Sequence, residues 1–155
     1  MKRFYTLLFA TALTAAVNVT AADDIKLKLA DSKVTPGQGV SSDLAGYNDG
    51  EEKIFFYAPG TAEWTFKVAD DGEYTLLIKA SCDPAQGMNA KFKVTLDGKA
   101  VGEEVTLTSE GEKEYKVVAK LKKGENKLGI TFTNDVYKEG EYDRNLYLHG
   151  VTVKK

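Results

Sequence analysis

The chain has 155 residues, of which 43% are hydrophobic and 28% are charged, and its formal net charge is −2 at pH 7. This balance, with basic and acidic residues interspersed, argues against nucleic acid or another polyanion as the partner. The single cysteine, Cys82, excludes an internal disulfide, and the presence of only one histidine argues against a zinc site. The domain must therefore be held together mainly by its hydrophobic core.

The first residues are typical of a secretory signal peptide. Lys2 and Arg3 precede an apolar run from Phe4 to Val17, and small residues follow this run. The run is too short for a membrane span, and no later stretch of the sequence approaches that length. We therefore expect residues 1–22 to be removed and residues 23–155 to form one secreted or periplasmic domain that has no membrane partner.

The segment from Val34 to Asp49 differs from the rest of the chain because it is rich in turn residues. Thr35 to Gly39 and Tyr47 to Gly50 are both typical of loops. A connection of this length in a compact domain is often functional or packed over the end of a sheet. We therefore expect an irregular segment here.

Most of the chain after residue 60 has hydrophobic residues at every second position, the pattern of strands with one buried face. The alternation occurs at 64–68, 74–80, 90–96, 115–121 and 128–132. The last run, Leu146 to Val153, changes phase, which predicts a β-bulge near Gly150. Turn sequences such as Asp97-Gly98 separate the runs, and no stretch has the period of an amphipathic helix. We therefore predict an all-β fold, a two-sheet antiparallel β-sandwich of the jelly-roll type.

Several residues that could carry chemistry fit structural roles better. Trp64 lies on the inward register of its run, so we expect it in the core. Cys82 is expected to be a small buried residue near a strand end, and His149 to be a surface or hydrogen-bonded residue. The adjacent aromatic residues at 55–57 place a ring on both faces of a strand. We expect them mainly to pack against the protein, with the alternative that one of them is exposed near a ligand.

An acidic, aromatic loop separates the last two strand-like runs. Asp135 and Asp143 bracket it, with Tyr137 and Tyr142 between them. Carboxylates and nearby carbonyl groups suit Ca²⁺, which takes six to eight oxygen ligands, and exposed tyrosines offer an apolar surface to a ring-shaped ligand. The aspartates could instead be turn formers that bond their own backbone, and the tyrosines could simply cover the end of a sheet. The residues alone leave both interpretations open.

The order of residues in this loop resembles the C-terminal signature of the calcium-dependent xylan-binding carbohydrate-binding modules of families 60 and 36. The resemblance rests on Asn134-Asp135 followed, after a short aromatic loop, by the run from Asp143 to Leu148. The hairpin around residues 90–99 and the runs at 62–68 and 72–76 fit the wider β-jelly-roll superfamily of sugar-binding modules. The resemblance therefore spans roughly Ala62 to Val153.

This resemblance implies a Ca²⁺ site in a loop at one end of the sandwich. Asp135 and Asp143 would be side-chain ligands, and the main-chain carbonyl of Tyr142 would be a further ligand. Another main-chain carbonyl is expected from an N-terminal loop, at either Tyr47 or Asn48. Two neighbouring hydroxyl groups of a sugar would complete the shell of the cation.

The resemblance also assigns roles to the other loop residues. Tyr137, Tyr142 and Asn134 are expected to contact the sugar. Arg144 and Asn145 are expected to brace the loop by hydrogen bonds. Carboxylates bound to a cation stay ionised, which suits ligation better than the general acid role of a glycoside hydrolase.

The residues and the resemblance together predict a non-catalytic, exported module that binds a xylan-like or related β-glycan through Ca²⁺. No nucleophile elbow, zinc-binding histidine pair or phosphate loop is present in the sequence, so it does not favour an enzyme. The alternative is an exported structural or adhesion β-sandwich with a purely structural Ca²⁺ site and a protein partner. The two differ in whether the cation keeps coordination positions open to a ligand.

Overall fold

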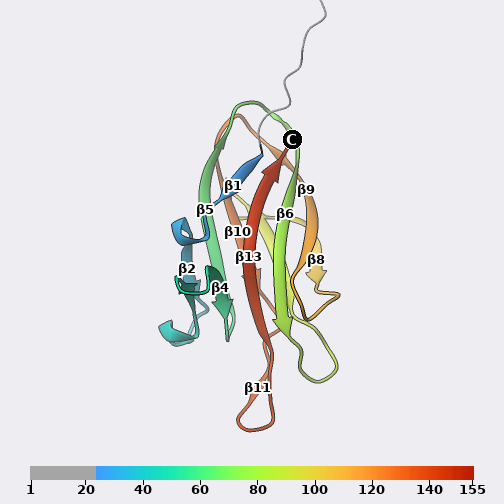
Figure 1. The fold of residues 1–155 in the computed structure, drawn as a ribbon. Coiled ribbons are helices and arrows are strands. Elements are labelled where there is room, and N and C mark those ends of the chain that lie inside the picture. The colour runs from blue at the N-terminus through green and yellow to red at the C-terminus, as the bar shows by residue number, and fades with distance from the viewer. Residues whose placement is uncertain (1–23) are drawn as a thin grey trace, which may run out of the picture.

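The computed structural model describes residues 24–155, so the expected signal peptide lies outside the described residues. Figure 1 shows an elongated molecule built of strands, with the hairpin marked β11 at the end opposite the C-terminus. The helical elements of this part are two short 3-10 turns, η1 (Leu29–Asp31) and η2 (Ser42–Leu44). No helix of the described part is long and apolar enough to cross a membrane.

One sheet has six strands in the order β3-β4-β13-β6-β9, and β1 also pairs with β13. All its pairs are antiparallel. Its strands are β1 (Ile25–Leu27), β3 (Ala45–Asn48), β4 (Lys53–Phe56), β6 (Gly72–Asp83), β9 (Lys113–Leu121) and β13 (Asn145–Lys154). The C-terminal strand β13 is therefore central, and β4 and β6 flank its first half.

The second sheet has five strands in the order β2-β5-β10-β7-β8, again all antiparallel. Its strands are β2 (Lys33–Pro36), β5 (Gly60–Val68), β7 (Lys91–Leu96), β8 (Lys99–Thr106) and β10 (Gly124–Phe132). A separate two-stranded ladder joins β11 (Tyr137–Lys138) to β12 (Tyr142–Asp143). The predicted two-sheet antiparallel sandwich is confirmed.

The core lies between the two sheets, where alternate side chains of each long strand meet. Phe56, Ile78 and Leu148 of the six-stranded sheet are fully buried, as are Phe92 and Phe132 of the five-stranded sheet. Burial of apolar surface contributes roughly 25 cal/mol per Å². This core, to which both sheets contribute, is therefore the main source of stability, and it supports the loops at the ends of the sandwich.

Two local predictions about the backbone are confirmed. The pairing of β13 with β6 shifts register between Leu148 and Gly150, which places a bulge where the hydrophobic phase changes. The turn between β7 and β8 has positive φ at both of its central residues, 49° at Asp97 and 78° at Gly98. That conformation is the one a tight hairpin turn requires, and Asp-Gly supports it at low cost.

The structural roles expected for three single residues are also confirmed. Trp64 is buried in the core, with 3% of its surface exposed, and Cys82 is buried on β6. His149 is half-buried, with its Nε2 atom 2.7 Å from the hydroxyl of Ser81. Its Nδ1 atom lies 3.4 Å from a carboxylate oxygen of Glu112.

The prediction of one irregular segment from Val34 to Asp49 is wrong at both ends and holds for residues 37–44. This part of the chain holds most of β2 and all of β3, joined by the short turn η2. Each strand has only four residues, too few for a clear alternation, and the turn residues around them dominate the pattern. β2 is an edge strand that ends at Pro36, a position where a missing N–H group costs little.

Candidate functional site

The acidic loop lies between β10 and β13, at the end of the sandwich where β11 projects in Figure 1. The β11–β12 ladder pairs Tyr137 with Asp143 and Lys138 with Tyr142, so the loop is a short hairpin. The two chain segments are also joined just outside this ladder, on the side of β10 and β13, where the N–H group of Arg144 donates to the carbonyl of Val136 at 3.0 Å. The hairpin therefore brings Asp135 and Asp143 together at its base.

Three side-chain oxygens at this base are buried and lack a hydrogen-bond partner among the described residues. They are the Oδ1 atoms of Asp135, Asp143 and Asn145. Burial, and after it the charge of Asp143, raises the pKa of Asp135, so the two carboxylates repel each other. Buried acceptors without donors are costly, and three of them in one place are a group that a cation could satisfy.

The donor set at the base fits a hard cation. It consists of two carboxylates and one amide, and oxygen ligands of this kind suit Ca²⁺. In residues 24–155 no three His, Cys, Asp or Glu side chains gather in a way that could hold a metal ion by themselves. A cation at this base would therefore depend on the Asn145 amide and on main-chain carbonyls as well as on the two aspartates.

Arg144 is buried between the loop and its neighbours, with 2% of its surface exposed. Its guanidinium group donates to the main-chain carbonyls of Ala85, Met88 and Asn134. Ala85 and Met88 bond to each other across a tight turn after β6, so the arginine fastens this turn to the acidic loop. The planar fork of guanidinium donors explains why one side chain can serve three carbonyls.

The side chain of Asn134 is directed at the backbone near the start of β7. Its Oδ1 atom accepts a hydrogen bond from the N–H group of Lys91 at 2.6 Å, and its Nδ2 atom donates to the carbonyl of Asn89 at 3.0 Å. Both ends of the amide are thus engaged within the protein. The structure places Asn134 as an anchor of the loop, although the resemblance assigns it a sugar contact.

A cleft of about 500 Å³ opens beside the two aspartates. It is lined by Leu44, Tyr57, Ala58, Asp135, Tyr137 and Asp143. The exposed fraction is 63% for Tyr137 and 39% for Tyr57, so two aromatic rings line the cleft together with the carboxylates and remain open to solvent. Tyr142 is half-buried on β12, next to Asp143 and opposite Lys138.

Tyr57 is a cleft residue that the sequence pattern marked only as one of three adjacent aromatic residues. It follows β4, in which Phe56 points into the core, so the two residues beside Phe56 point outward. The ring of Tyr57 lies 4.8 Å from that of Phe55 and 6.2 Å from that of Tyr147, measured between ring centroids. The alternation of faces could have placed it on the surface, but only the pairing of β4 with β13 places it at the cleft.

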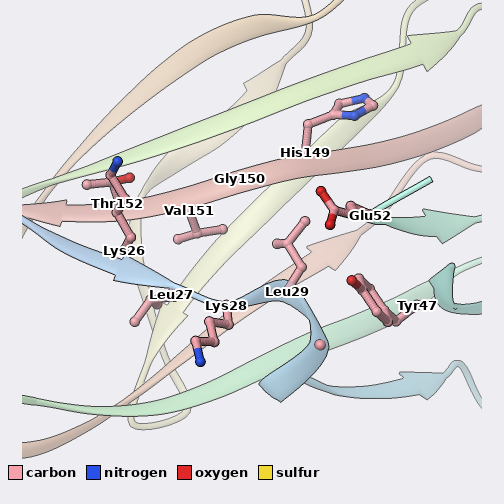
Figure 2. Close-up of a pocket in the computed structure, with 11 residues that line it drawn as sticks. Lys26, Leu27, Lys28, Leu29, Tyr47, Glu52, His149, Gly150, Val151 and Thr152 are labelled. Atoms are coloured by element: carbon pink, nitrogen blue, oxygen red, sulfur yellow. The ribbon is translucent and has the colours of Figure 1, made fainter. Parts of the chain in front are cut away.

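The structure does not bring Tyr47 or Asn48 to this cleft. In the pairing of β3 with β4, Ala45 lies opposite Phe56 and Asn48 lies opposite Lys53, so both residues are further from the cleft end of the sheet. Figure 2 shows Tyr47 in a different pocket of about 400 Å³, beside Glu52. The contribution of this strand pair to the cleft comes from Leu44, just before β3, and from Tyr57 and Ala58, just after β4, which meet at one end of the pair.

A family model of Ca-dependent, xylan-binding carbohydrate-binding modules (CBM60) matches residues 75–155, which is more than half of the chain. The match includes the acidic loop, the turn fastened by Arg144 and the whole of β13. No curated protein matches the chain.

Solved structures with this fold include a family 35 carbohydrate-binding module from Clostridium thermocellum. Its TM-score is 0.60 and its identity 18%, and the match covers 85% of this chain and 98% of that one. A family 36 module in complex with calcium and xylotriose has a TM-score of 0.61 and an identity of 12%, with coverage of 86% and 100%. A family 35 module from Paenibacillus barcinonensis has a TM-score of 0.56 and an identity of 17%, with coverage of 86% and 99%. At these identities the likeness establishes the fold.

Proposed function

Because the chain belongs to CBM60, the family of Ca-dependent, xylan-binding carbohydrate-binding modules, we propose that it binds a xylan-like β-glycan through Ca²⁺ at this cleft. The observation that carries the proposal is the group of three buried, unpaired oxygens beside the cleft. The proposal includes the absence of catalytic activity. It also includes export with loss of residues 1–22, which rests on the sequence pattern alone.

The residues that would hold the cation are those at the base of the loop. Asp135 and Asp143 supply two negative charges, and Asn145 supplies an amide oxygen through Oδ1. The main-chain carbonyl of Tyr142 is a fourth ligand in the proposal. When bound, Ca²⁺ would offer sugar hydroxyl groups those positions of its shell of six to eight oxygens that the protein leaves free.

The aromatic rings beside the carboxylates suit the apolar face of a sugar. Tyr57 and Tyr137 both line the cleft and are both exposed, so a pyranose ring that reaches the aspartates could pack against one of them. A carbohydrate site commonly joins such apolar walls to a few fixed polar groups. The cleft has both, and the polar groups are already held by the fold.

Calorimetric titration of the protein with xylan and related β-glycans tests the proposed function. We expect binding in the presence of Ca²⁺ and its loss after addition of a chelator, because few groups other than the cation would hold the hydroxyls. Glycan binding that persists in chelator would contradict the mechanism. If Ca²⁺ raises the melting temperature but no glycan binds, the site is structural, as in the alternative with a protein partner.

We expect Tyr137→Ala to weaken glycan binding by roughly threefold to tenfold, the size of one aromatic contact. The affinity for Ca²⁺ should stay unchanged, since the ring is not among the oxygen ligands. Titration of each variant with CaCl2 and then with glycan separates the two effects. Val118→Ala, which truncates an exposed side chain on β9, is the control. Equal glycan affinity in Tyr137→Ala and the wild type would remove this ring from the binding surface.

A further inference from the structure

Asp83 is a carboxylate that lies outside the acidic loop but is hydrogen-bonded to its base. It is the last residue of β6 and pairs with Asn145, the first residue of β13. Its Oδ2 atom accepts a hydrogen bond from the Nδ2 atom of Asn145 at 3.1 Å. The same oxygen accepts a second hydrogen bond from the hydroxyl of Tyr147 at 2.6 Å. Asp83 is therefore fixed by two donors from β13.

The amide of Asn145 is held between two carboxylates. Its Nδ2 atom donates to Asp83 and also to the Oδ2 atom of Asp143, at 3.1 Å in each case. Only the NH₂ end of an amide can donate to carboxylates, so these two acceptors decide which way the amide faces. Its Oδ1 atom must then face away from both, and it is buried and unpaired, in a residue with 6% of its surface exposed.

The same contacts orient Asp143. Because its Oδ2 atom accepts from Asn145, its other oxygen, Oδ1, is the one left buried without a partner. The amide group of Asn145 therefore sets the direction of two of the three unpaired oxygens, its own Oδ1 atom and that of Asp143. The orientation of that amide depends in turn on Asp83.

We propose that Asp83 is a positioning residue of the cation site and acts through Asn145. This inference rests on the proposed function, since it concerns the same Ca²⁺ site, and it adds a residue from a distant strand to that site. Partners that orient metal ligands commonly contribute 10- to 100-fold in metal affinity. A buried amide with a fixed direction would give the cation an oxygen ligand at little cost in conformational entropy.

Tyr147 helps to hold Asp83 in place, in addition to Asn145. Its hydroxyl donates to the carboxylate of Asp83 at 2.6 Å. The Lys53 ammonium lies 4.4 Å from the centre of the Tyr147 ring, and the Tyr57 ring meets it edge-on. The tyrosine that holds Asp83 is thus itself held in place.

Asp83 could also attract Ca²⁺ simply by its negative charge, and one substitution separates the two effects. Asp83→Asn removes the charge but keeps an oxygen that can accept from both Asn145 and Tyr147. Asp83→Ala removes the charge and the acceptor together. If Asp83 acts by positioning, the asparagine variant should retain most of the Ca²⁺ affinity and the alanine variant should not.

The experiment is a calorimetric titration of the full chain with CaCl2 alone, together with the melting temperature in chelator. We expect Asp83→Ala to weaken Ca²⁺ binding by roughly 10- to 100-fold and Asp83→Asn by about threefold or less. Tyr147→Phe removes one of the two donors to Asp83 and should weaken binding by a few-fold. Glu114→Ala, which removes an exposed carboxylate on β9, should leave the affinity unchanged.

Wild-type Ca²⁺ affinity in Asp83→Ala would overturn the inference, even if its melting temperature in chelator fell. An equally large loss in Asp83→Asn and Asp83→Ala would also overturn it, in favour of an effect of charge alone. If Asp83→Ala does not fold, Tyr147→Phe decides: unchanged affinity there would count against positioning. Failure of the wild type to bind Ca²⁺ would instead contradict the proposed function itself.

Discussion

Asp143→Ala is expected to abolish Ca²⁺-dependent glycan binding while the β-sandwich remains folded. The substitution removes one of the two carboxylates at the loop base and frees the amide of Asn145 from one of its two acceptors. Asp143 lies outside the hydrophobic core, and changes in a loop away from the core usually cost little stability. Asp143→Asn should be nearly as harmful, because it keeps the shape but removes the charge that a hard cation needs.

Glycan affinity and melting temperature of the variants test this prediction, with Asp97→Asn as the control. Asp97 is an aspartate of another turn, where its Oδ1 atom accepts from the N–H group of Lys127 at 2.9 Å. Asparagine offers the same acceptor and tolerates the same positive φ, so binding should be intact. Wild-type affinity in Asp143→Ala would refute the site. Loss of the folded state in that variant would favour the structural role of the cation.

Arg144→Ala is expected to lower the free energy of unfolding by about 3 kcal/mol. Three carbonyls would lose the guanidinium donor. Those of Ala85 and Met88 would keep the hydrogen bonds between these two residues, so the cost is that of three lost hydrogen bonds, at about 1 kcal/mol each. For a domain of this size the melting temperature should fall by about 10 °C. Glycan binding should weaken as well, because the turn after β6 and the acidic loop would no longer be fastened to each other.

Thermal unfolding in chelator measures this effect without the contribution of bound Ca²⁺. Arg144→Lys should be almost as destabilising, because one ammonium group cannot reproduce the planar fork that serves three carbonyls. Lys154→Ala, at an exposed position on β13, should change the melting temperature by no more than about 2 °C. A similarly small change in Arg144→Ala would show that water replaces the three lost hydrogen bonds.

The fold could be predicted largely from local sequence, because a strand that is buried on one face imposes its alternation on its own residues. The long strands β5, β6, β7, β9 and β10 were predicted for this reason, and the bulge at Gly150 was predicted from a change of phase. The short strands β2 and β3 were missed, since pairing with neighbours far along the chain stabilises them and four residues carry little pattern. The acidic loop was predicted as a unit because its aspartates are close in sequence.

The parts of the site that the sequence did not reveal come from distant segments. Asp83 reaches the loop through the pairing of β6 with β13, and Tyr57 reaches the cleft beside the pairing of β4 with β13. No local pattern singles out either residue, since an aspartate at a strand end and an outward tyrosine are both common. The N-terminal contribution expected at Tyr47 or Asn48 depends on the register of β3 against β4, which a single sequence does not specify.

The acidic hairpin has a fixed base and a free tip, and this division bears on how such a module could change its preference among sugars. Arg144 and Asn134 bind the base to the connection between β6 and β7, at residues 85–91. Residues 138–141 are exposed, and among them the side chains are joined only by an ion pair between Lys138 and Glu141. Insertions or substitutions in the tip would leave the oxygens of the proposed cation site where they are. Evolution or protein engineering could thus vary the surface offered to a glycan while the proposed cation ligands are inherited unchanged.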